Sequence, residues 1–245
     1  MNIVRTKPYD KVSAIYEGLM RKLDYESWSK YILLIAEDNI HSQSKILELG
    51  SGNCKMAEII SAIYQDYFAT DISLPMLRSS NRNRLTKVCC DMTLLPFKTK
   101  FDFIFSAFDS VNYILKKKWL LNLFNEVNYL LEKDGLFTFD VSLEENSLDF
   151  VISKTTEDKH NGNLYQMISK YNSRSRIHYN KFYIWNDSGK KYKEVHKEKI
   201  YNIDTYFQLA EKAGLQTVAC YDCFDFKDVN SKSKRAQFVM RKTNQ

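Results

Sequence analysis

The feature that most constrains the fold of this chain is a repeated alternation between short apolar runs and segments with a helical period. From residue 45 to residue 140, strand-like runs rich in Ile, Leu and Phe alternate with segments whose apolar residues recur every three or four positions. Strands that alternate with helices build a mostly parallel sheet with helices on its faces. The sequence therefore predicts an α/β fold.

Seven runs have the composition and length of strands. They are 45–49, 67–70, 87–90, 101–105, 136–140, 216–221 and 236–241. The intervening helices carry start and stop signals. Ser73 is expected to cap a helix that has Pro75 in its first turn. Residues 120–131 show the clearest helical spacing, and Gly135 is expected to end that helix. One further predicted helix buries Met56, Ile59, Ile60 and Ile63 on one face. Another spans 206–213 and is expected to end at Gly214.

Two regions depart from this alternation. Residues 1–40 are rich in aromatic side chains and are predicted to form an N-terminal helical cap. Residues 146–202 show polar and aromatic alternation with a hairpin turn at 187–189, which predicts an antiparallel β insertion over the carboxyl edge of the sheet. No linker divides the chain. We therefore expect a single domain (1–245) whose core comprises 41–145 and 203–245.

Composition and charge narrow the class of protein. The apolar run at 32–36 is too short for a membrane span, and the N-terminus lacks the apolar core of a secretory signal, so a cytoplasmic protein without membrane contact is expected. The net charge of +6 lies partly in short lysine-rich runs at 116–118 and 190–193. Short, separate runs favour solvated surface over a nucleic-acid interface, although a nucleic-acid partner stays open.

The five cysteines do not predict a disulfide framework, because they are odd in number and lack the spacing of small disulfide-rich scaffolds. Cys89 and Cys90, together with Cys220 and Cys223, raise the alternative of a zinc site. Their flanking residues resemble strand rather than the tight turn that a metal-binding pair needs. We therefore expect buried free thiols and no metal.

Acidic residues recur at or near the ends of the first three predicted strands. Glu48 lies in the first strand, Asp71 follows the second, and Asp91 follows the third. Gly50 and Gly52 follow the first strand and permit a tight turn where backbone approaches a ligand. Ligands of open parallel sheets bind beyond the carboxyl ends of the strands, so this edge is the predicted binding site.

A dinucleotide site is the main alternative ligand site for this edge. The dinucleotide fingerprint requires a third glycine at position 55, which is Lys55 here. A ligand without a pyrophosphate does not need that glycine, so S-adenosylmethionine (SAM) is favoured over NAD. A glycine turn or a strand-terminal Asp is by itself commonly structural. Their ordered recurrence after three strands gives the pattern its meaning.

The ordered motifs at 46–52, 70–77, 90–92 and 130–140 resemble those of class I SAM-dependent methyltransferases. The segments 16–20, 24–28, 109–113, 224–226 and 234–235 resemble a bacterial subfamily called YqeM-like, which is similar to sugar N,N-dimethyltransferases and glycine N-methyltransferases. The resemblance implies a Rossmann-like seven-stranded mixed sheet, mostly parallel with an antiparallel last strand. Two departures are Cys54, where the family usually has glycine, and Tyr16-Glu17, where it has Tyr-Asp.

The resemblance also implies a set of residues that hold SAM and its product S-adenosylhomocysteine. Asp71 is expected to bind the ribose hydroxyls, Ile72 to pack on adenine, and Asp91 with Met92 to bind the adenine amino group. Residues expected around the methionine part and the rest of the cofactor are Tyr16, Glu48, Gly50, Ser51, Gly52, Met76 and Ser106.

Methyl transfer from a sulfonium needs alignment, desolvation and, for some acceptors, removal of a proton. Asp109 and His196 are the candidate catalytic residues, and His196 beside Glu194 is the candidate general base. The alternative for His196 is a solvated strand histidine. The candidate substrate-binding residues are Tyr25, Trp28, Asn112 and Tyr113. For the aromatic residues of 16–28, simple helix packing is the competing interpretation.

Three functions stay open at this point. The first is methylation of an N or O atom of a small-molecule acceptor by a monomer or homodimer. The second is methylation of RNA or protein, although the chain lacks an Asn-Pro-Pro-Tyr motif and a Pro-Cys nucleophile. The third is a SAM-binding subunit without turnover. The acceptor itself is not indicated by the sequence.

Overall fold

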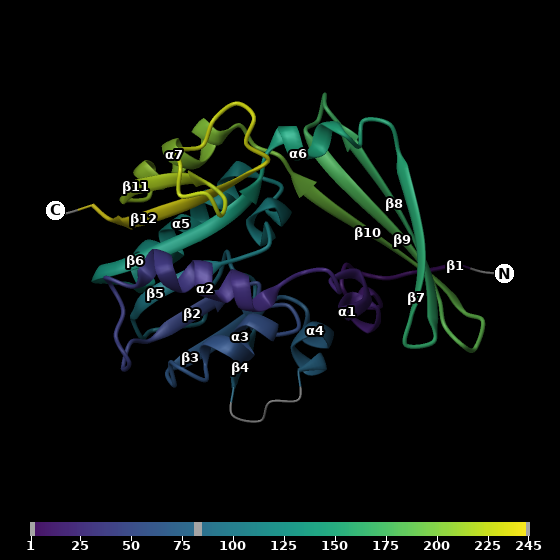
Figure 1. Cartoon of the computed structure of the whole chain (residues 1–245), viewed down its shortest axis with the longest axis horizontal. Coiled ribbons are helices and arrows are strands. Elements are labelled where there is room, and N and C mark those ends of the chain that lie inside the picture. Colours follow the sequence, from purple (N-terminus) through teal and green to yellow (C-terminus); the bar gives the residue numbers. More distant parts are fainter. Residues whose placement is uncertain (1–2, 81–84, 244–245) are drawn as a thin grey trace.

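The computed structural model describes residues 3–80 and 85–243, which form two β-sheets with helices packed around the larger one (Figure 1). Within these residues the larger sheet has seven strands and the smaller sheet has five. The chain starts beside the smaller sheet and crosses to the larger sheet before its first core strand (Figure 1). The N-terminal segment therefore contacts both parts of the molecule.

The larger sheet confirms the predicted fold class. Its order is β11-β12-β6-β5-β2-β3-β4, and among the described strands of this sheet β12 alone runs opposite to the other six. The strands are β2 (Ile46–Leu49), β3 (Tyr67–Asp71), β4 (Thr86–Cys89), β5 (Phe101–Ser106), β6 (Leu131–Ser142), β11 (Leu215–Asp222) and β12 (Arg235–Lys242). The carboxyl ends of β2, β3, β4 and β5 therefore meet at one edge.

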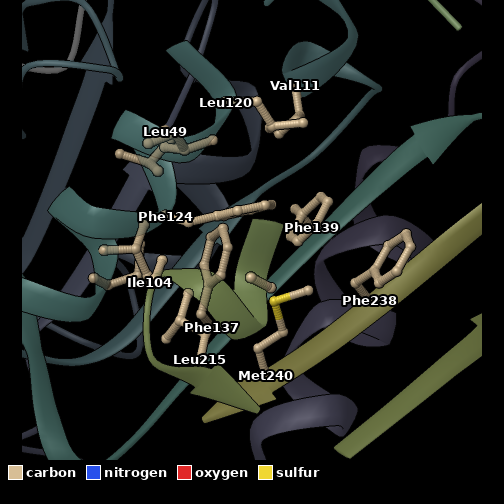
Figure 2. Packing of buried hydrophobic residues seen from close by; sticks show 14 of the residues in the cluster. Leu49, Ile104, Val111, Leu120, Phe124, Phe137, Phe139, Leu215, Phe238 and Met240 are labelled. Carbon is tan, nitrogen blue, oxygen red and sulfur yellow. The ribbon is translucent and has the colours of Figure 1, made fainter. Parts of the chain in front are cut away.

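Helices cover both faces of this sheet because alternate strand residues point to opposite sides. In β2, Leu47 and Leu49 join the core beneath α5 (Lys117–Leu130) and α7 (Ile203–Lys212), whereas Ile46 joins the core beneath α2 (Tyr25–Ala36) and α3 (Lys55–Ile60). Figure 2 shows Phe124 of α5 among Phe137, Phe139 and Phe238 of the sheet. The helices are α2 (Tyr25–Ala36), α3 (Lys55–Ile60), α4 (Leu74–Ser79), α5 (Lys117–Leu130) and α7 (Ile203–Lys212).

Two helix ends differ from the prediction. Gly135 does not end α5, because the helix stops at Leu130 and β6 begins at the next residue. A Cβ at Gly135 would lie 3.0 Å from the carbonyl oxygen of Asp102, so a close approach of two backbones requires this glycine. Helix α3 ends at Ile60, and Ile63 lies beyond it with 57% of its surface exposed. Ile63 is therefore not part of the buried helix face.

The smaller sheet is formed mainly by four consecutive antiparallel strands. These are β7 (Lys154–His160), β8 (Asn163–Asn172), β9 (Ile177–Trp185) and β10 (Lys191–Lys199), preceded by the short helix α6 (Glu144–Leu148). The turn between β9 and β10 contains Gly189 with a φ of +75°, as expected for a glycine in a hairpin. The region 146–202 thus forms its own sheet, in which one face packs against the rest of the chain.

The sequence predicts a helical N-terminal cap, but this region also contains a strand. Strand β1 (Ile3–Arg5) pairs in parallel with β10, and only then follow the 3₁₀ turn η1 (Val12–Ala14) and the short helix α1 (Tyr16–Leu19). The sequence does not reveal this strand, because a three-residue strand has no periodicity and is held by a partner almost 190 residues away. Residues 1–2 of the predicted cap lie outside the described residues.

The described cysteines differ in their exposure to solvent. Cys54 is buried, Cys90, Cys220 and Cys223 are half-buried, and all described cysteines are free. Cys89 is exposed, so the prediction of a buried thiol is wrong for that residue. Within 3–80 and 85–243, no cluster of three His, Cys, Asp or Glu residues could bind a metal, and no helix could span a membrane.

The side chain of Asn112 links the two sheets. It lies in the 3₁₀ turn η2 (Ser110–Tyr113) after β5 and is fully buried. Its Nδ2 donates to the carbonyl oxygens of Ser142 and Lys199 at 3.2 and 3.0 Å, and its Oδ1 accepts from Ser142 N at 2.9 Å. Every polar atom of the side chain already bonds backbone, which disfavours the predicted contact of Asn112 with a substrate.

We expect Asn112→Ala to lower the free energy of unfolding by about 2–4 kcal/mol, because three buried backbone groups lose their partner. Urea denaturation measures the change. Asn122→Ala on the exposed side of α5 is the matched control and should change stability by less than about 0.5 kcal/mol. Equal effects of the two substitutions would contradict a linking role for Asn112.

Candidate active site

The loop after β2 makes a tight turn at the carboxyl edge of the larger sheet. Gly50 and Gly52 have φ values of +71° and +56°. A Cβ at Gly50 would lie 2.8 Å from Ser110 Oγ, and one at Gly52 would lie 3.9 Å from the Tyr16 hydroxyl. Ser51 N donates to the Thr70 carbonyl at 2.8 Å, which ties the loop to β3. The loop is thus a cradle with little room for side chains.

Cys54 keeps the conformation that the resemblance expects of a glycine. Its φ of 61° and ψ of 24° lie in the left-handed region, and its N–H donates to the Ser51 carbonyl at 2.8 Å. Burial of the side chain accompanies this uncommon backbone for a non-glycine residue. Cys54 thus adopts a left-handed backbone conformation that a glycine would reach without steric cost.

Asp71 joins the first two loops of this edge. Its Oδ2 accepts from Gly52 N at 2.9 Å and its Oδ1 accepts from Ser73 N at 2.7 Å. Burial raises the pKa of this carboxyl, and the backbone donors at Ser73, Gly52 and Ile72 oppose the rise. The neighbouring Ile72 leaves 67% of its surface exposed. Asp71 thus places a carboxylate beside an uncovered apolar side chain.

The third loop carries Asp91 and Met92. Asp91 is exposed, and its Oδ1 accepts from both the N–H and the hydroxyl of Thr93 at 2.8 Å. A Cβ at Gly50 would lie 3.4 Å from Met92 Cε, and a Cβ at Gly52 would lie 3.3 Å from Cε of Met76 on α4. Two flexible methionines therefore border the glycine turn.

Glu48 and Ser106 lie beneath this edge rather than on it. Glu48 is 3% exposed and accepts from the Tyr67 hydroxyl at 2.7 Å. Burial raises the pKa of Glu48 to about 7, against the opposing effect of the Tyr67 hydrogen bond. The Ser106 hydroxyl donates to the Leu49 carbonyl at 2.9 Å and is fully buried. Its side chain is therefore committed to the sheet, which disfavours the expected contact with a ligand.

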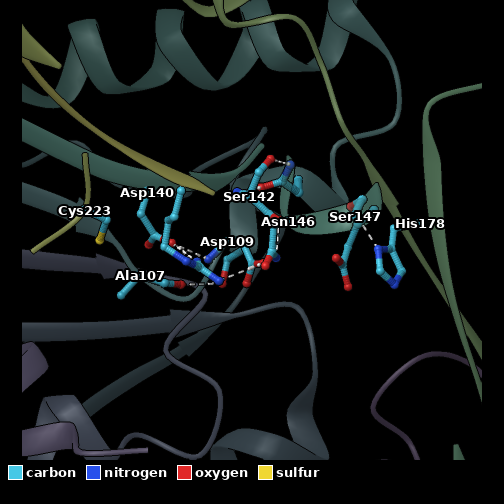
Figure 3. A network of polar contacts seen from close by, with 12 residues as sticks. Ala107, Asp109, Asp140, Ser142, Asn146, Ser147, His178 and Cys223 are labelled. Carbon is cyan, nitrogen blue, oxygen red and sulfur yellow. Dashed lines mark hydrogen bonds and ion pairs between the residues drawn. The ribbon is translucent and has the colours of Figure 1, made fainter. Parts of the chain in front are cut away.

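Asp109 belongs to a cluster of three charged groups at the ends of β5, β6 and β12. Arg235 donates to Asp140 and, at 3.2 Å, to Asp109 Oδ2, while Asp109 N donates to Asp140 Oδ2 at 2.9 Å. Figure 3 shows Asp109 and Asp140 side by side. Burial alone would lower the pKa of Arg235, but Asp109 and Asp140 raise it above the ordinary value. Burial raises the pKa of Asp140 despite Arg235.

Aromatic rings pack around this charged cluster. Trp28 is 7% exposed, and its ring centroid lies 4.6 Å from that of Phe108. The Arg235 guanidinium lies 5.8 Å from the Trp28 ring centroid. Tyr25 contacts Phe108 edge-to-face at 5.6 Å. Helix packing therefore accounts for Trp28. The half-buried Tyr25 and the contact of Trp28 with Arg235 still place this helix at the border of the site.

His196 is buried, so the alternative of a solvated strand histidine is wrong. It is 2% exposed, and its Nε2 lies 3.2 Å from Glu194 Oε2. Its Nδ1 lies 3.2 Å from the Tyr113 hydroxyl, which in turn accepts from the Tyr9 hydroxyl at 2.7 Å. The smaller sheet therefore brings His196 to the turn that follows β5. The Tyr113 hydroxyl bonds side chains, whereas Asn112 bonds only backbone.

Tyr9 and Glu198 are candidate site residues that the sequence interpretation missed. Tyr9 packs edge-to-face on Tyr16 at 6.0 Å and on His196 at 4.5 Å. Glu198 accepts from Asn180 Nδ2 at 3.2 Å, and burial followed by the charge of Asp109 raises its pKa. The period of two in Glu194-x-His196-x-Glu198 could have placed all three on one strand face. No pattern in the residues around Tyr9 indicated a role for it.

Comparison with known proteins defines the class of the chain. Residues 46–135 match the family model described as a methyltransferase domain. This span starts with β2 and contains the glycine loop, Asp71 and Asp91. The match therefore indicates a methyltransferase domain in this span, and together with the fold it supports a Rossmann-like SAM-dependent methyltransferase.

Similar proteins extend the match to nearly the full length of the chain. YqeM of Bacillus subtilis (strain 168), which carries the name of a methyltransferase, is 22% identical over 244 residues that cover 96% of this chain and 97% of YqeM. A SAM-dependent methyltransferase structure from Clostridium acetobutylicum is 24% identical, with a TM-score of 0.80 and coverage of 96% and 99%. The sugar N-methyltransferase KedS8 from a Streptoalloteichus species is 12% identical, with a TM-score of 0.76 and coverage of 93% and 91%. These likenesses support the YqeM-like resemblance.

The buried Glu48 carboxyl generates a prediction about pH. Its pKa of about 7 lies above the ordinary value of 4.5, so the stability that neutral Glu48 contributes is complete below about pH 4.5 and is lost as the pH rises through 7. Glu48→Gln removes this titration and should reduce the pH dependence of the unfolding free energy between pH 5 and 8.5 by on the order of 3 kcal/mol.

Urea denaturation at the two pH values measures this difference. Glu132→Gln, at an exposed position of β6, is the matched control and should retain the pH dependence of the original chain. If Glu48→Gln shows the same pH dependence as the control, Glu48 does not fold in its neutral form.

Proposed function

We propose that the chain transfers the methyl group of SAM to an N or O atom of a small-molecule acceptor at the carboxyl edge of the larger sheet. The observation that carries this proposal is the arrangement of Asp71, which connects the glycine loop to the β3 loop while Ile72 beside it stays uncovered. Polar groups of η2 and of the smaller sheet face one another next to this edge. Donor and acceptor would thus meet between the two sheets.

The residues of the edge fit the chemistry of SAM. We propose that Asp71 accepts from the ribose hydroxyls, Ile72 packs on the adenine ring, and Asp91 with the Met92 N–H binds the adenine amino group. The cradle, in which a Cβ at Gly50 would collide with Ser110, suits close backbone approach of a ligand. Further residues proposed to line the cofactor are Tyr16, Ser51, Gly52 and Met76, with Glu48 supporting the loop from below.

Bound SAM supplies an activated methyl group on a sulfonium. The residues of the chain then align the acceptor, exclude water and remove its proton. We propose His196 as the general base, since its imidazole lies between a carboxylate and a tyrosine hydroxyl. Asp109 pairs with Arg235 and is proposed to orient the acceptor. Tyr25, Trp28 and Tyr113 are proposed to border the acceptor.

The preference for a small acceptor rests on two points of support. The sugar N-methyltransferase KedS8 is similar over 93% of this chain, including the smaller sheet that borders the acceptor side. The groups on that side are polar and half-buried, as with Asp109 and Glu198, which suits a hydroxylated or aminated small molecule. The acceptor class is therefore proposed from both the similarity and the chemistry of the lining.

Transfer of radioactivity from [methyl-³H]SAM tests the function. We expect incorporation into a small-molecule extract of bacterial cells, separated from its RNA and protein by filtration, and no incorporation into those macromolecular fractions. Heat-denatured protein is the control. Label in RNA or protein alone would contradict the small-molecule proposal, and SAM binding with no label in any fraction would contradict turnover.

Asp71→Ala should weaken SAM binding by roughly 1.5–3 kcal/mol, because charged hydrogen bonds to the ribose are lost. Isothermal titration calorimetry with SAM measures the change. The matched control is Asp134→Ala, an exposed position at the opposite end of β6, which should bind SAM as the original chain does. Unchanged affinity in Asp71→Ala would remove the basis of the proposed cofactor site.

A further inference from the structure

A continuous chain of hydrogen bonds runs through the space between the two sheets. Its members come from three separate segments: Tyr9 precedes η1, Tyr113 ends η2, and Glu194 with His196 lies on β10. The Tyr9 and Tyr113 oxygens are 2.7 Å apart, Tyr113 lies 3.2 Å from His196 Nδ1, and His196 Nε2 lies 3.2 Å from Glu194 Oε2. Four polar side chains are thus connected in one line.

The Glu194 end of this series of hydrogen bonds is held in place by the N-terminal segment. Glu194 is fully buried, and its Oε1 accepts from the Thr6 hydroxyl at 3.1 Å, from Val12 N at 3.3 Å and from Lys11 N. These three donors leave Oε2 to face His196. Because a carboxylate only accepts hydrogen bonds, the His196 proton belongs on Nε2 and its Nδ1 is left as an acceptor for Tyr113.

The Tyr9 end of this series of hydrogen bonds lies beside the proposed cofactor loops. The Tyr9 carbonyl accepts from the hydroxyl of Ser73, the residue that follows Asp71 and Ile72 and caps α4, at 3.3 Å. The Tyr9 backbone has a φ of 63°, an uncommon value for a bulky residue that is typical of functional positions. A phenol oxygen that donates one hydrogen bond still has acceptor capacity, so Tyr9 can receive a proton from a bound molecule.

We propose that Tyr9, Tyr113 and His196 form a proton relay that removes the proton of the methyl acceptor, and that Glu194 positions the relay. This inference rests on the proposed function and adds to it the group that touches the acceptor, the hydroxyl of Tyr9. His196 is then the terminal base and does not contact the acceptor itself. The arrangement uses the same principle as other histidine bases that a buried carboxylate orients.

The relay step balances in atoms and charge. A bond forms between the acceptor N or O atom and the methyl carbon, and the bond between that carbon and the sulfonium sulfur breaks with its electron pair moving to sulfur. The acceptor proton passes to the Tyr9 oxygen, the Tyr9 proton to the Tyr113 oxygen, and the Tyr113 proton to His196 Nδ1. The positive charge thus moves from sulfur to the imidazolium, which the Glu194 carboxylate stabilises.

Glu194→Gln tests the positioning role without removing the anchor. The amide oxygen of the substituted side chain would keep the three donors of the N-terminal segment, so its NH₂ group would face His196 Nε2. An amide donor at that place requires Nε2 to be unprotonated, which moves the proton to Nδ1 and blocks acceptance from Tyr113. Imidazole ¹⁵N shifts distinguish the two tautomers, with His196→Gln identifying the resonances.

We expect the Nε2–H tautomer in the original chain and the Nδ1–H tautomer in Glu194→Gln. The initial rate of transfer from saturating [methyl-³H]SAM into the small-molecule extract should fall roughly 100- to 10,000-fold in Glu194→Gln, as is typical of losing a general base. The SAM affinity should stay within about threefold, because Glu194 lies outside the proposed cofactor loops. A Nδ1–H tautomer in the original chain would overturn the relay.

Tyr9→Phe and Tyr113→Phe test the two hydroxyl steps. Each should lower the transfer rate roughly 100-fold or more while SAM affinity stays within about threefold. Tyr206→Phe is the matched control, since the Tyr206 hydroxyl is buried in the core without a hydrogen-bond partner among the described residues. This control should transfer methyl groups at the rate of the original chain.

The outcomes separate the relay from the proposed function. Transfer by the original chain together with unchanged rates in Tyr9→Phe, Tyr113→Phe and Glu194→Gln would overturn the relay and leave the methyltransferase proposal standing. No transfer by the original chain would overturn both. Reduced rates that coincide with the tautomer change, at unchanged SAM affinity, would support the relay.

Discussion

The parallel pairing of β2 with β3 and β5 is the constraint on which the rest of the structure depends. Parallel strands end at the same edge of a sheet, so the loops after them must share one space. The half-buried carboxylate of Asp71 uses this proximity by accepting from the N–H groups of Gly52 and Ser73, which lie in two different loops. Without that register the glycine turn would have no fixed partner, and the proposed sites for donor and acceptor would not lie side by side.

Much of this fold could be predicted because its strands are marked by local apolar runs and its loops by local glycines and acids. The strand β2, the cap at Ser73 and the order of Asp71 and Asp91 all follow from nearby residues. The errors concern long-range contacts. The requirement for a glycine at 135 comes from the Asp102 carbonyl, and the bonds of Asn112 reach Ser142 and Lys199. Neither set of partners can be inferred from local periodicity.

The candidate site shows the same division between local and long-range information. His196 is identified by its type and its neighbour Glu194, yet its environment depends on Tyr9 and Tyr113, which lie far away in sequence. A strand histidine with polar neighbours has the same local pattern whether its face meets water or another part of the chain. This face is buried because the smaller sheet packs against η2, held in part by Asn112, and because the N-terminal segment with Tyr9 covers it.

The two candidate catalytic residues differ in a way that separates their roles. The Asp109 carboxylate faces the Arg235 guanidinium at 3.2 Å, so its negative charge is already engaged. Two carboxyl groups, Asp109 and Asp140, share this single guanidinium in a partly buried setting where charges act strongly. His196, in contrast, has a hydrogen-bond acceptor on one nitrogen and a hydroxyl on the other. We infer that Asp109 shapes the electrostatic field at the acceptor, whereas proton removal falls to the histidine that the smaller sheet supplies.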